Sequence, residues 1–400
     1  MTDTTANRVP VQAEKTAFAV LIAVSFCHML NDIMQSMLAA IYPMLKADYG
    51  LDFWQIGLLT MAFQVTASLL QPAIGLTTDK KPMPYSLPVG MGSTFIGLLL
   101  LATAANYSLL LVGAMFVGLG SAIFHPESSR VARLASGGRY GLAQAVFQVG
   151  GNAGTAIGPL LAAFIVVPRG QTSVAWFSLA ALLGMMVLWR VSAWYAAYRQ
   201  RAASRPAPAK TLTLPKGKVA MSLAILVSLV FAKNVYMAGI SSYYTFFLIE
   251  KFGVTVQQSQ ILLFVFLGSV AAGTVLGGLV GDRIGSKTVI WFSILGVLPF
   301  TLALPYANFF WTPVLTVAIG LILASAFPQI VVFAQELLPG RVGMVAGMFF
   351  GFAFGLGGLG AAVLGIVADS QGIEFVYKIC SYLPLLGLLT VFLPNLKKAG

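Results

Sequence analysis

Two ionisable residues, Asp32 and Lys233, lie inside long apolar runs of the chain. An ionisable side chain at membrane depth is costly and by default marks a binding site or an ion pathway. His28 precedes Asp32 by four positions, so the two share one face of a helix. Asn31 and Gln35 add a neighbouring polar pair. These residues predict a polar functional site, although a structural Asp32–Lys233 bridge that locks two helices is an alternative.

A charged turn, Gly75–Lys81, is repeated as Gly278–Lys287, with Asp79 and Asp282 203 positions apart. Each Asp is expected at the C-terminal end of a helix, where the helix dipole disfavours a lone anion. We therefore expect a cation or the N-terminus of another helix as its partner. The alternative is that Asp282 only fixes a tight turn. The expected gating residues are Asp79, Lys80, Glu127, Arg130, Asp282, Arg283, Glu336 and Arg341. Glu127, Arg130, Glu336 and Arg341 could form bridges between the two halves, or could equally be ordinary interface residues.

Few residues of the chain could form a metal site or an enzyme active site. The two cysteines, Cys27 and Cys380, both lie in apolar runs, and His28 and His125 are the only histidines. This composition provides no four-ligand zinc pattern, so we expect no metal and no cofactor. No clustered nucleophile and base or group of carboxylates indicates an enzyme. His125 is expected either to relay protons or to be a hydrogen-bonded structural residue.

The composition of the chain predicts the membrane-spanning helices that position these residues. The 400-residue chain is 58% hydrophobic and 9% charged, with a mean hydropathy of +0.88, whereas about a quarter of the residues in a soluble domain are charged. Since a membrane-crossing helix needs about 20 apolar residues, the sequence predicts an all-α polytopic membrane protein. The twelve expected spans are 17–45, 54–77, 84–103, 107–126, 140–167, 173–196, 218–248, 256–280, 288–307, 312–335, 342–368 and 375–394.

The chain is expected to consist of two related halves. A basic, proline-containing linker, 197–217, separates bundles at 17–196 and 218–394, and tails 1–16 and 395–400 flank them. The halves align at the same offset elsewhere: Asn31 matches Asn234, and Gly50 matches Gly253. Parallel repeats of this kind are a transporter plan, with the substrate site between the halves near the midplane.

Charge distribution predicts the orientation. By these limits, 19 of the 24 Lys and Arg residues lie on the side of the tails and the linker. The positive-inside rule places that side in the cytoplasm, so both termini are expected there. The net charge of +12 is therefore interpreted as a topology signal, and no nucleic-acid partner is expected.

Two motifs resemble a known family. Gly278-x-x-Gly281-Asp282-Arg283-x-Gly285-x-Lys287 resembles the loop signature of the major facilitator superfamily, although Lys81 and Pro82 depart from it in the first copy. The run from Gly150 to Pro159 resembles the helix 5 motif of the drug:proton antiporter branch. The resemblance implies a monomer in the bacterial inner membrane. It also implies proton-coupled efflux of a small drug such as fosmidomycin by alternating access, with the proton gradient as the energy source.

The resemblance and the residues together assign roles. Asp32 and His28 are expected to couple protons, because burial favours a neutral carboxyl group and a nearby cation favours the ionised one. Lys233 is expected to bind an anionic group such as a phosphonate. The other expected substrate-binding residues are Asn31, Gln35, Asn234, Tyr236, Gln148 and Asn152.

Glycines spaced four residues apart predict close packing between helices. Gly150, Gly154 and Gly158 line one face, Pro159 adds a bend, and Gly347, Gly351 and Gly355 are expected as their counterparts in the second half. Alternatives for the whole chain are a major facilitator importer or symporter of a small metabolite, a membrane-embedded enzyme, and a channel.

Overall fold

A computed structural model describes residues 16–51, 53–203 and 214–396. Throughout these ranges the regular elements are helices, so the predicted all-α class is confirmed. Most of the expected N-terminal tail, the central part of the expected linker and the last four residues lie outside the described residues.

The helices fall into two consecutive sets. The first set is α1 (Phe18–Ala40), α2 (Tyr42–Tyr49), α3 (Phe53–Gln64), η1 (Val65–Leu69), α4 (Leu70–Lys80), α5 (Ser86–Thr103), α6 (Tyr107–Ala135), α7 (Tyr140–Leu161), η2 (Ala162–Val166), α8 (Val167–Arg169), η3 (Gln171–Trp176) and α9 (Phe177–Ala203). The second set is α10 (Lys216–Phe252), α11 (Val256–Ile284), α12 (Ser286–Ile294), α13 (Leu298–Ala303), η4 (Leu304–Tyr306), α14 (Trp311–Ala324), α15 (Ala326–Leu337), α16 (Val342–Gln371), α17 (Ile373–Cys380) and η5 (Leu383–Phe392).

Eleven helical runs among the described residues are long and apolar enough to cross a membrane, and the apolar part of α16, Val342–Gly357, adds a shorter one. This agrees with twelve spans, although several boundaries differ from those expected. The first span ends at Ala40, and the following residues form the separate helix α2. The helix α9 continues to Ala203, because the alanines and arginines of its last turns are good helix formers.

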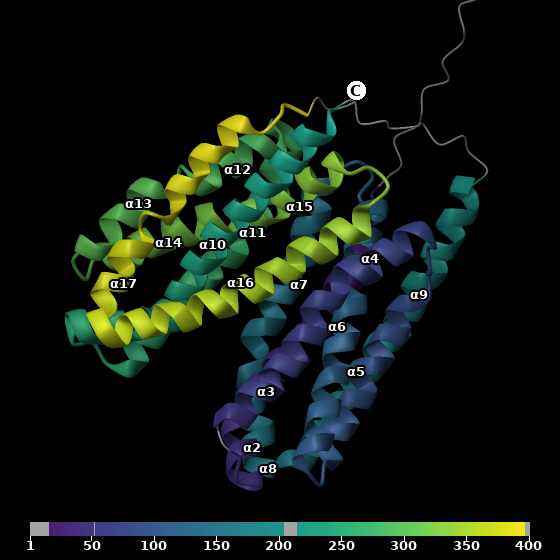
Figure 1. Ribbon diagram of the computed structural model, residues 1–400, viewed down its shortest axis with the longest axis horizontal. Coiled ribbons are helices and arrows are strands. Elements are labelled where there is room, and N and C mark those ends of the chain that lie inside the picture. Colours follow the sequence, from purple (N-terminus) through teal and green to yellow (C-terminus); the bar gives the residue numbers. More distant parts are fainter. Residues whose placement is uncertain (1–15, 52, 204–213, 397–400) are drawn as a thin grey trace, which may run out of the picture.

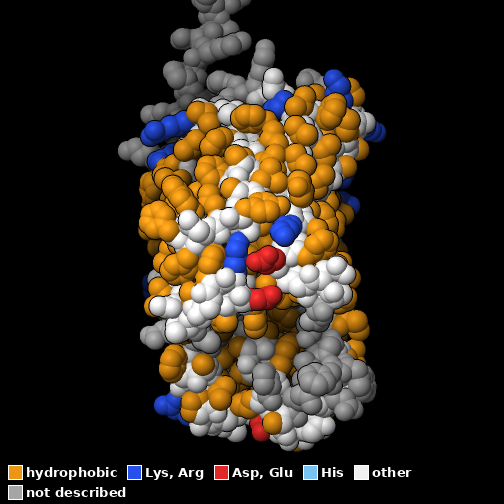
Figure 2. All heavy atoms as spheres, turned by 90° about the vertical axis from the view of Figure 1, so that its left-hand side faces the viewer, with side chains coloured by type: hydrophobic (Ala, Val, Ile, Leu, Met, Phe, Trp, Pro, Cys, Tyr) orange, Lys and Arg blue, Asp and Glu red, His pale blue; other side chains and the backbone are white. Residues whose placement is uncertain are grey.

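Figure 1 shows the two sets as two bundles that meet near the C-terminus and diverge toward the opposite end. We call the end where they meet, which carries the end of α9 and the start of α10, the linker end. The most extensive contacts between the bundles there are those of α4 with α16 and of α7 with α11, and α6 also packs on α16. Figure 2 shows the surface hollowed where the bundles separate, below a central group of charged side chains.

Apolar side chains cover much of the outer surface (Figure 2). Phe164 is 74% exposed, and Leu69 and Ile366 are each 70% exposed. A soluble monomer rarely exposes such large contiguous apolar patches. The exposed residues therefore belong to a surface that faces lipid.

The backbone keeps the repeat that the sequence predicts. Gly50 and Gly253, at the ends of α2 and α10, have φ angles of 62° and 66°. Glycine adopts this left-handed conformation without the steric cost that other residues incur. The matched glycines therefore end matched helices in the two halves.

Contacts along α16 show how the bundles separate. A side-chain carbon added at Gly343 would clash with Arg130, and one at Gly347 would clash with the backbone of Gln71. At Gly351 the added carbon would lie 2.8 Å from the backbone oxygen of Ser68, whereas at Gly355 nothing lies within 4 Å. The bundles are thus in backbone contact at the linker end and separate within about three turns of α16.

The two glycine sets have different partners, which corrects the expected equivalence. Gly150, Gly154 and Gly158 face the backbone of α1 in their own bundle, whereas Gly347 and Gly351 face the other bundle. Gly360 and Gly365 of α16 face α10 instead, beside Val235 and Tyr243. The helix α7 continues through Pro159, and the wider π-helical turn η2 follows at Ala162.

Candidate functional site

Three buried ionisable side chains from α1 and α6 meet inside the first bundle. The Nε2 atoms of His28 and His125 are 3.2 Å apart. The carboxylate of Asp32 lies 3.4 Å from His28 Nε2 and 3.7 Å from His125 Nε2. We call His28, Asp32 and His125 the polar triad. It includes His125, which the sequence placed only as a relay or a structural residue.

Hydrogen bonds orient both imidazole rings. His28 Nδ1 lies 2.8 Å from the backbone oxygen of Phe147, and His125 Nδ1 lies 3.0 Å from that of Ser121. A carbonyl oxygen can only accept, so each Nδ1 carries the hydrogen and donates it. The lone pairs of the two Nε2 atoms then face one another across 3.2 Å. A proton added to the triad has a place between them, and Asp32 supplies the balancing negative charge.

Neighbouring amides hold the Asp32 carboxylate. Asn31 Nδ2 and Gln35 Nε2 donate to Asp32 Oδ1 over 3.1 and 3.0 Å. Thus the structure brings together the four residues of α1 that the sequence singled out. Gly151 of α7 closes the other side, where an added side-chain carbon would press on the His28 ring and lie 2.9 Å from Asp32 Oδ2.

Lys233 of α10 lies in the second bundle and is half-buried. Its ammonium group lies 3.4 Å from Asn234 Oδ1 and 5.1 Å from the centre of the Phe327 ring. No ion pair joins Lys233 to Asp32 in the described parts of the chain. The alternative of a structural Asp32–Lys233 bridge is therefore wrong for this conformation.

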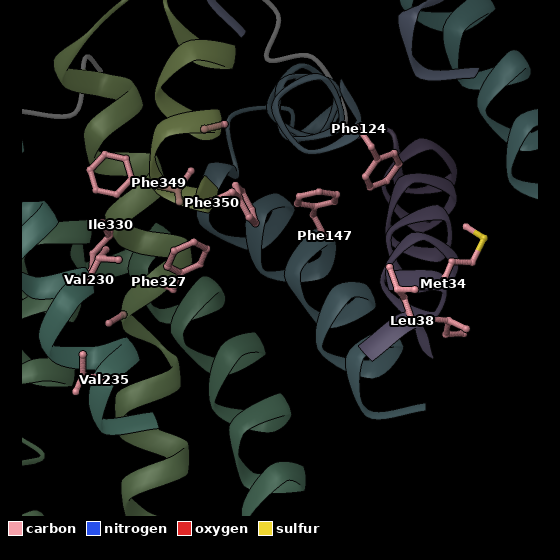
Figure 3. Packing of buried hydrophobic residues seen from close by; sticks show 14 of the residues in the cluster. Met34, Leu38, Phe124, Phe147, Val230, Val235, Phe327, Ile330, Phe349 and Phe350 are labelled. Carbon is pink, nitrogen blue, oxygen red and sulfur yellow. The ribbon is translucent and has the colours of Figure 1, made fainter. Parts of the chain in front are cut away.

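Aromatic rings separate the polar triad from Lys233. His28 stacks on Phe147, with ring centres 4.1 Å apart. Phe350 of α16 lies 5.3 Å from the His125 ring and 5.2 Å from Phe327. Figure 3 shows Phe350 between Phe147 and Phe327 at the boundary of the bundles. A residue of the second bundle therefore covers a buried site of the first.

The remaining predicted binding residues divide into two groups. On α7, Gln148 Nε2 donates to Asn152 Oδ1 over 3.2 Å, and both side chains are half-buried. Tyr236, in contrast, is 3% exposed and lines a small space between α10 and α17 with Tyr377 and Cys380. The structure therefore places Tyr236 inside the second bundle.

The two repeated aspartates each accept hydrogen bonds from the opposite bundle. Asp79, at the end of α4, accepts from the backbone N–H groups of Gly343 and Met344 over 3.0 and 2.9 Å. Asp282, at the end of α11, accepts from those of Gly141 and Leu142 over 2.8 and 2.9 Å. The Asp79 carboxylate thus lies at the first turn of α16 and the Asp282 carboxylate at the first turn of α7, where the positive end of the helix dipole favours an anion. We call these contacts the two latches.

A buried arginine supports the first latch. Arg130 forms ion pairs with Asp79 and with Glu127, both in its own bundle. Glu127 and Arg130 therefore do not bridge to Glu336 and Arg341. Two hydrogen bonds join α6 to α15 across the bundles: Arg133 donates to Gln335 Oε1 over 3.1 Å, and Gln335 Nε2 donates to Ser129 Oγ over 3.2 Å.

The other predicted gating residues are peripheral. Lys80, Arg283 and Arg341 are exposed. Glu336 is half-buried and interacts electrostatically with Arg133. Sequence reasoning missed Arg133 and Gln335, yet a signal existed: Pro126 and Pro328 are 202 positions apart, and so are Arg133 and Gln335.

The polar triad is also the group of potential metal ligands in the described part of the chain, with its ligand-type atoms within 4.8 Å of one another. Two imidazoles and a carboxylate suit a transition metal as well as a proton. The expectation that the chain uses no metal remains a prediction.

Comparisons with known proteins give the family. A profile of the Major Facilitator Superfamily matches residues 24–362 and 224–399. The chain belongs to the major facilitator superfamily. The fosmidomycin resistance protein of Escherichia coli (strain K12) is 60% identical over 381 residues, which cover 95% of this chain and 94% of that protein. The uncharacterized MFS-type transporter YfnC of Bacillus subtilis (strain 168) is 41% identical over 391 residues, 96% of this chain and 94% of that one.

Solved major facilitator structures share the fold. The transporter FucP in the outward conformation aligns with a TM-score of 0.70 and 16% identity, over 95% of this chain and 99% of that chain. The human organic anion transporter MFSD10 aligns with a TM-score of 0.74 and 18% identity, over 95% of this chain and all of the other. The family match and the 60% identical relative show that the chain is a multi-pass membrane transporter of the major facilitator superfamily, with small molecules as its substrates.

Proposed function

We propose that this transporter exports a small anionic drug such as fosmidomycin across the bacterial inner membrane in exchange for protons. The polar triad carries the proposal, because it can hold one proton in a buried place next to the boundary of the bundles. The 60% identity to a fosmidomycin resistance protein supports the choice of substrate. The transporter acts as a monomer, draws its energy from the proton gradient, needs no cofactor and has no catalytic activity.

Coupling runs through Asp32 and His28, with His125 as their partner. A proton shared by the two Nε2 atoms cancels the charge of Asp32, and its release restores that charge. The two protonation states differ in net charge by one. A conformation that solvates the two protonation states differently therefore changes in population when the polar triad gains or loses its proton.

Substrate binding involves Lys233. Its ammonium group has no carboxylate within ion-pairing distance among the described residues, so its charge is available to a phosphonate. The amide groups of Asn234, Gln148 and Asn152 supply additional hydrogen-bond donors and acceptors. Binding of an anion at Lys233 and of a proton at the polar triad then take place on opposite sides of Phe350.

Alternating access follows from the two latches. The linker end, which we propose to be cytoplasmic, is closed by both latches, and the opposite end is open. Return to the other conformation requires that Asp79 and Asp282 both release the helix N-termini that they hold. The bundles would then rock about the site between them.

Everted membrane vesicles with an acidic interior test the proposal. The unmodified protein is expected to accumulate fosmidomycin inside and to release protons as it does so. Asp32→Asn abolishes both processes, whereas Asp48→Asn, which changes an exposed carboxylate near the opposite end, leaves both unchanged.

Three results would contradict parts of the proposal. Accumulation that needs an alkaline interior indicates a symporter. Proton-coupled transport at full rate by Asp32→Asn removes the coupling role. No transport of fosmidomycin, together with pH-driven transport of another small molecule, keeps the mechanism and removes the substrate.

A further inference from the structure

A groove of about 1100 Å³ runs along the outside of the first bundle, between α1, α5 and α9. Its walls are apolar and include Val20, Val89, Leu183 and Met186. Arg190 is the one charged residue among the described residues that line it. The groove lies on the lipid-facing surface and does not reach the polar triad.

The groove begins at the depth of lipid headgroups. Tyr85 immediately precedes the first residue of α5, and its ring centre lies 5.0 Å from that of Trp189. Trp and Tyr are enriched at the membrane–water interface, where one side of the ring is apolar and the other is wet. Arg190 follows Trp189 directly, so its guanidinium group starts from the same level.

The groove extends well into one leaflet. Its residues on α9 extend from Trp194 back to Leu182. The seven positions from Trp189 to Leu182 span roughly 10 Å, which is about two thirds of the ~15 Å half-thickness of the hydrocarbon core. An acyl chain that starts at the level of Trp189 and Trp194 can therefore follow the groove toward the midplane.

The guanidinium group of Arg190 lacks a protein partner. No hydrogen bond or ion pair joins it to any other residue that the structure describes, and the side chain is exposed. A guanidinium group has five N–H donors, in a geometry that matches two phosphate oxygens. Lys80 and Lys81, at the end of α4, add positive charge at the same end of the bundle.

We propose that this groove binds one anionic phospholipid from the leaflet at the linker end. Arg190 pairs with the phosphate-containing headgroup, Tyr85 and Trp189 flank the headgroup, and one acyl chain lies between α5 and α9. Basic pockets between transmembrane helices are a known way to hold anionic headgroups. The binding site is distinct from the substrate pathway between the bundles.

Tryptophan fluorescence can report occupancy, because two of the six tryptophans, Trp189 and Trp194, line the groove. The reporter protein carries Phe in place of Trp54, Trp176, Trp291 and Trp311, and its transport activity is measured first. It is placed in vesicles of phosphatidylcholine with brominated acyl chains, which quench nearby tryptophans. Unbrominated phosphatidylglycerol is then added, and recovery of fluorescence is compared with recovery on adding unbrominated phosphatidylcholine.

Phosphatidylglycerol is expected to displace the quencher roughly fivefold better than phosphatidylcholine, since one basic residue near the surface contributes about 1 kcal/mol. Arg190→Gln removes this preference, and Arg190→Lys retains part of it. Arg169→Gln is the matched control, because Arg169 is an exposed arginine like Arg190 but does not line the groove. That variant keeps the full preference.

A variant that fills the groove provides a second test. At Gly92 an added side-chain carbon would lie 3.5 Å from Met185, an ordinary contact, so Gly92→Leu extends into the groove without a backbone clash. Both quenching and the lipid preference are expected to fall. Equal displacement by the two lipids in the reporter protein overturns the proposal, because it indicates bulk lipid only. An unchanged preference in Arg190→Gln overturns the role of the guanidinium group.

Discussion

Asp79 and Asp282 make the same contact in opposite directions across the two bundles. Each carboxylate accepts two backbone N–H groups from the first turn of a helix in the other half, at 2.8 to 3.0 Å. The surroundings differ. Asp79 is held by Arg130, which also pairs with Glu127, whereas the position 202 residues after Glu127 is the neutral Gln329. The two latches therefore share a geometry but differ in charge.

Removing either latch charge is expected to open the linker end. Asp79→Asn and Asp282→Asn each lose the attraction of a carboxylate for a helix N-terminus, worth up to about 2 kcal/mol when partly buried. The ratio of closed to open linker ends then falls by up to roughly 30-fold. Spin labels at Thr77→Cys and Ile284→Cys measure the change as a longer inter-bundle distance, since both native cysteines are buried.

The matched control for the latch variants is Asp48→Asn, which also removes one carboxylate but lies near the opposite end. It should leave the distance distribution unchanged. If the latch variants behave like this control, the aspartates only fix their own turns.

Loss of Arg130 is expected to destabilise the protein. Arg130→Met leaves the carboxylates of Asp79 and Glu127 buried and uncompensated, and breaking a buried ion pair from one side costs about 3–5 kcal/mol. Adding Glu127→Gln to this variant removes one of the two uncompensated charges and should recover part of the loss. Denaturant titration of the proteins in detergent measures the free energy of unfolding of both variants.

Arg139→Met is the control for Arg130→Met, because Arg139 is exposed and its guanidinium group lies over the face of Phe18, 5.7 Å from the ring centre. An exposed cation–π contact is worth about 0.5–1 kcal/mol. Equal losses for the two arginine variants would exclude a special role for the buried pair.

A methyl group at Gly151 is expected to impair coupling while the fold is kept. The added carbon presses on the His28 ring, whose Nε2 faces His125 and Asp32. Gly151→Ala should therefore reduce drug-dependent proton release more than drug binding. Gly357→Ala, where nothing lies within 4 Å, is the control, and equal coupling in the two variants would contradict the prediction.

Removal of metal ions is expected to leave transport unchanged. If the polar triad holds a proton, then chelation of divalent cations in everted vesicles does not affect pH-driven fosmidomycin accumulation. Loss of transport on chelation, followed by recovery with zinc but not magnesium, would identify the triad as a metal site.

Removal of the Lys233 charge is expected to weaken substrate binding. Lys233→Met should raise the KM for fosmidomycin at least tenfold, while proton release by the substrate-free protein is retained because the polar triad is intact. Lys233→Arg keeps the charge and should have a smaller effect. A KM that is the same in all three proteins would place the anion elsewhere.

Much of the architecture was predictable because it depends on composition and repetition. The lengths of the apolar runs predicted the membrane spans, and the offset of 203 positions paired Asp79 with Asp282 and Gly50 with Gly253. The dipole argument predicted a helix N-terminus or a cation as the partner of Asp282. It could not choose between them, since the choice depends on which helix of the other bundle begins beside the turn.

The polar triad was only partly predictable for a similar reason. Helical spacing placed His28 and Asp32 on one face, but His125 comes from α6, nearly a hundred positions later, and only the packing of α1 on α6 brings it close. Tyr236 shows the opposite error. It lies three positions after Lys233, which is nearly a full helical turn, yet its side chain points into the second bundle.

The reciprocal latches also constrain how such a chain could arise. In an isologous dimer, a residue of one subunit contacts a site on its partner, and the same residue of the partner makes the contact in return. Asp79 with the start of α16, and Asp282 with the start of α7, have this relationship. A single six-helix chain with one such aspartate and one such helix start would form both latches by pairing with its own copy. Fusion of the two copies then makes it possible for Arg130 and Glu127 to remain in one half while Gln329 stands in the other.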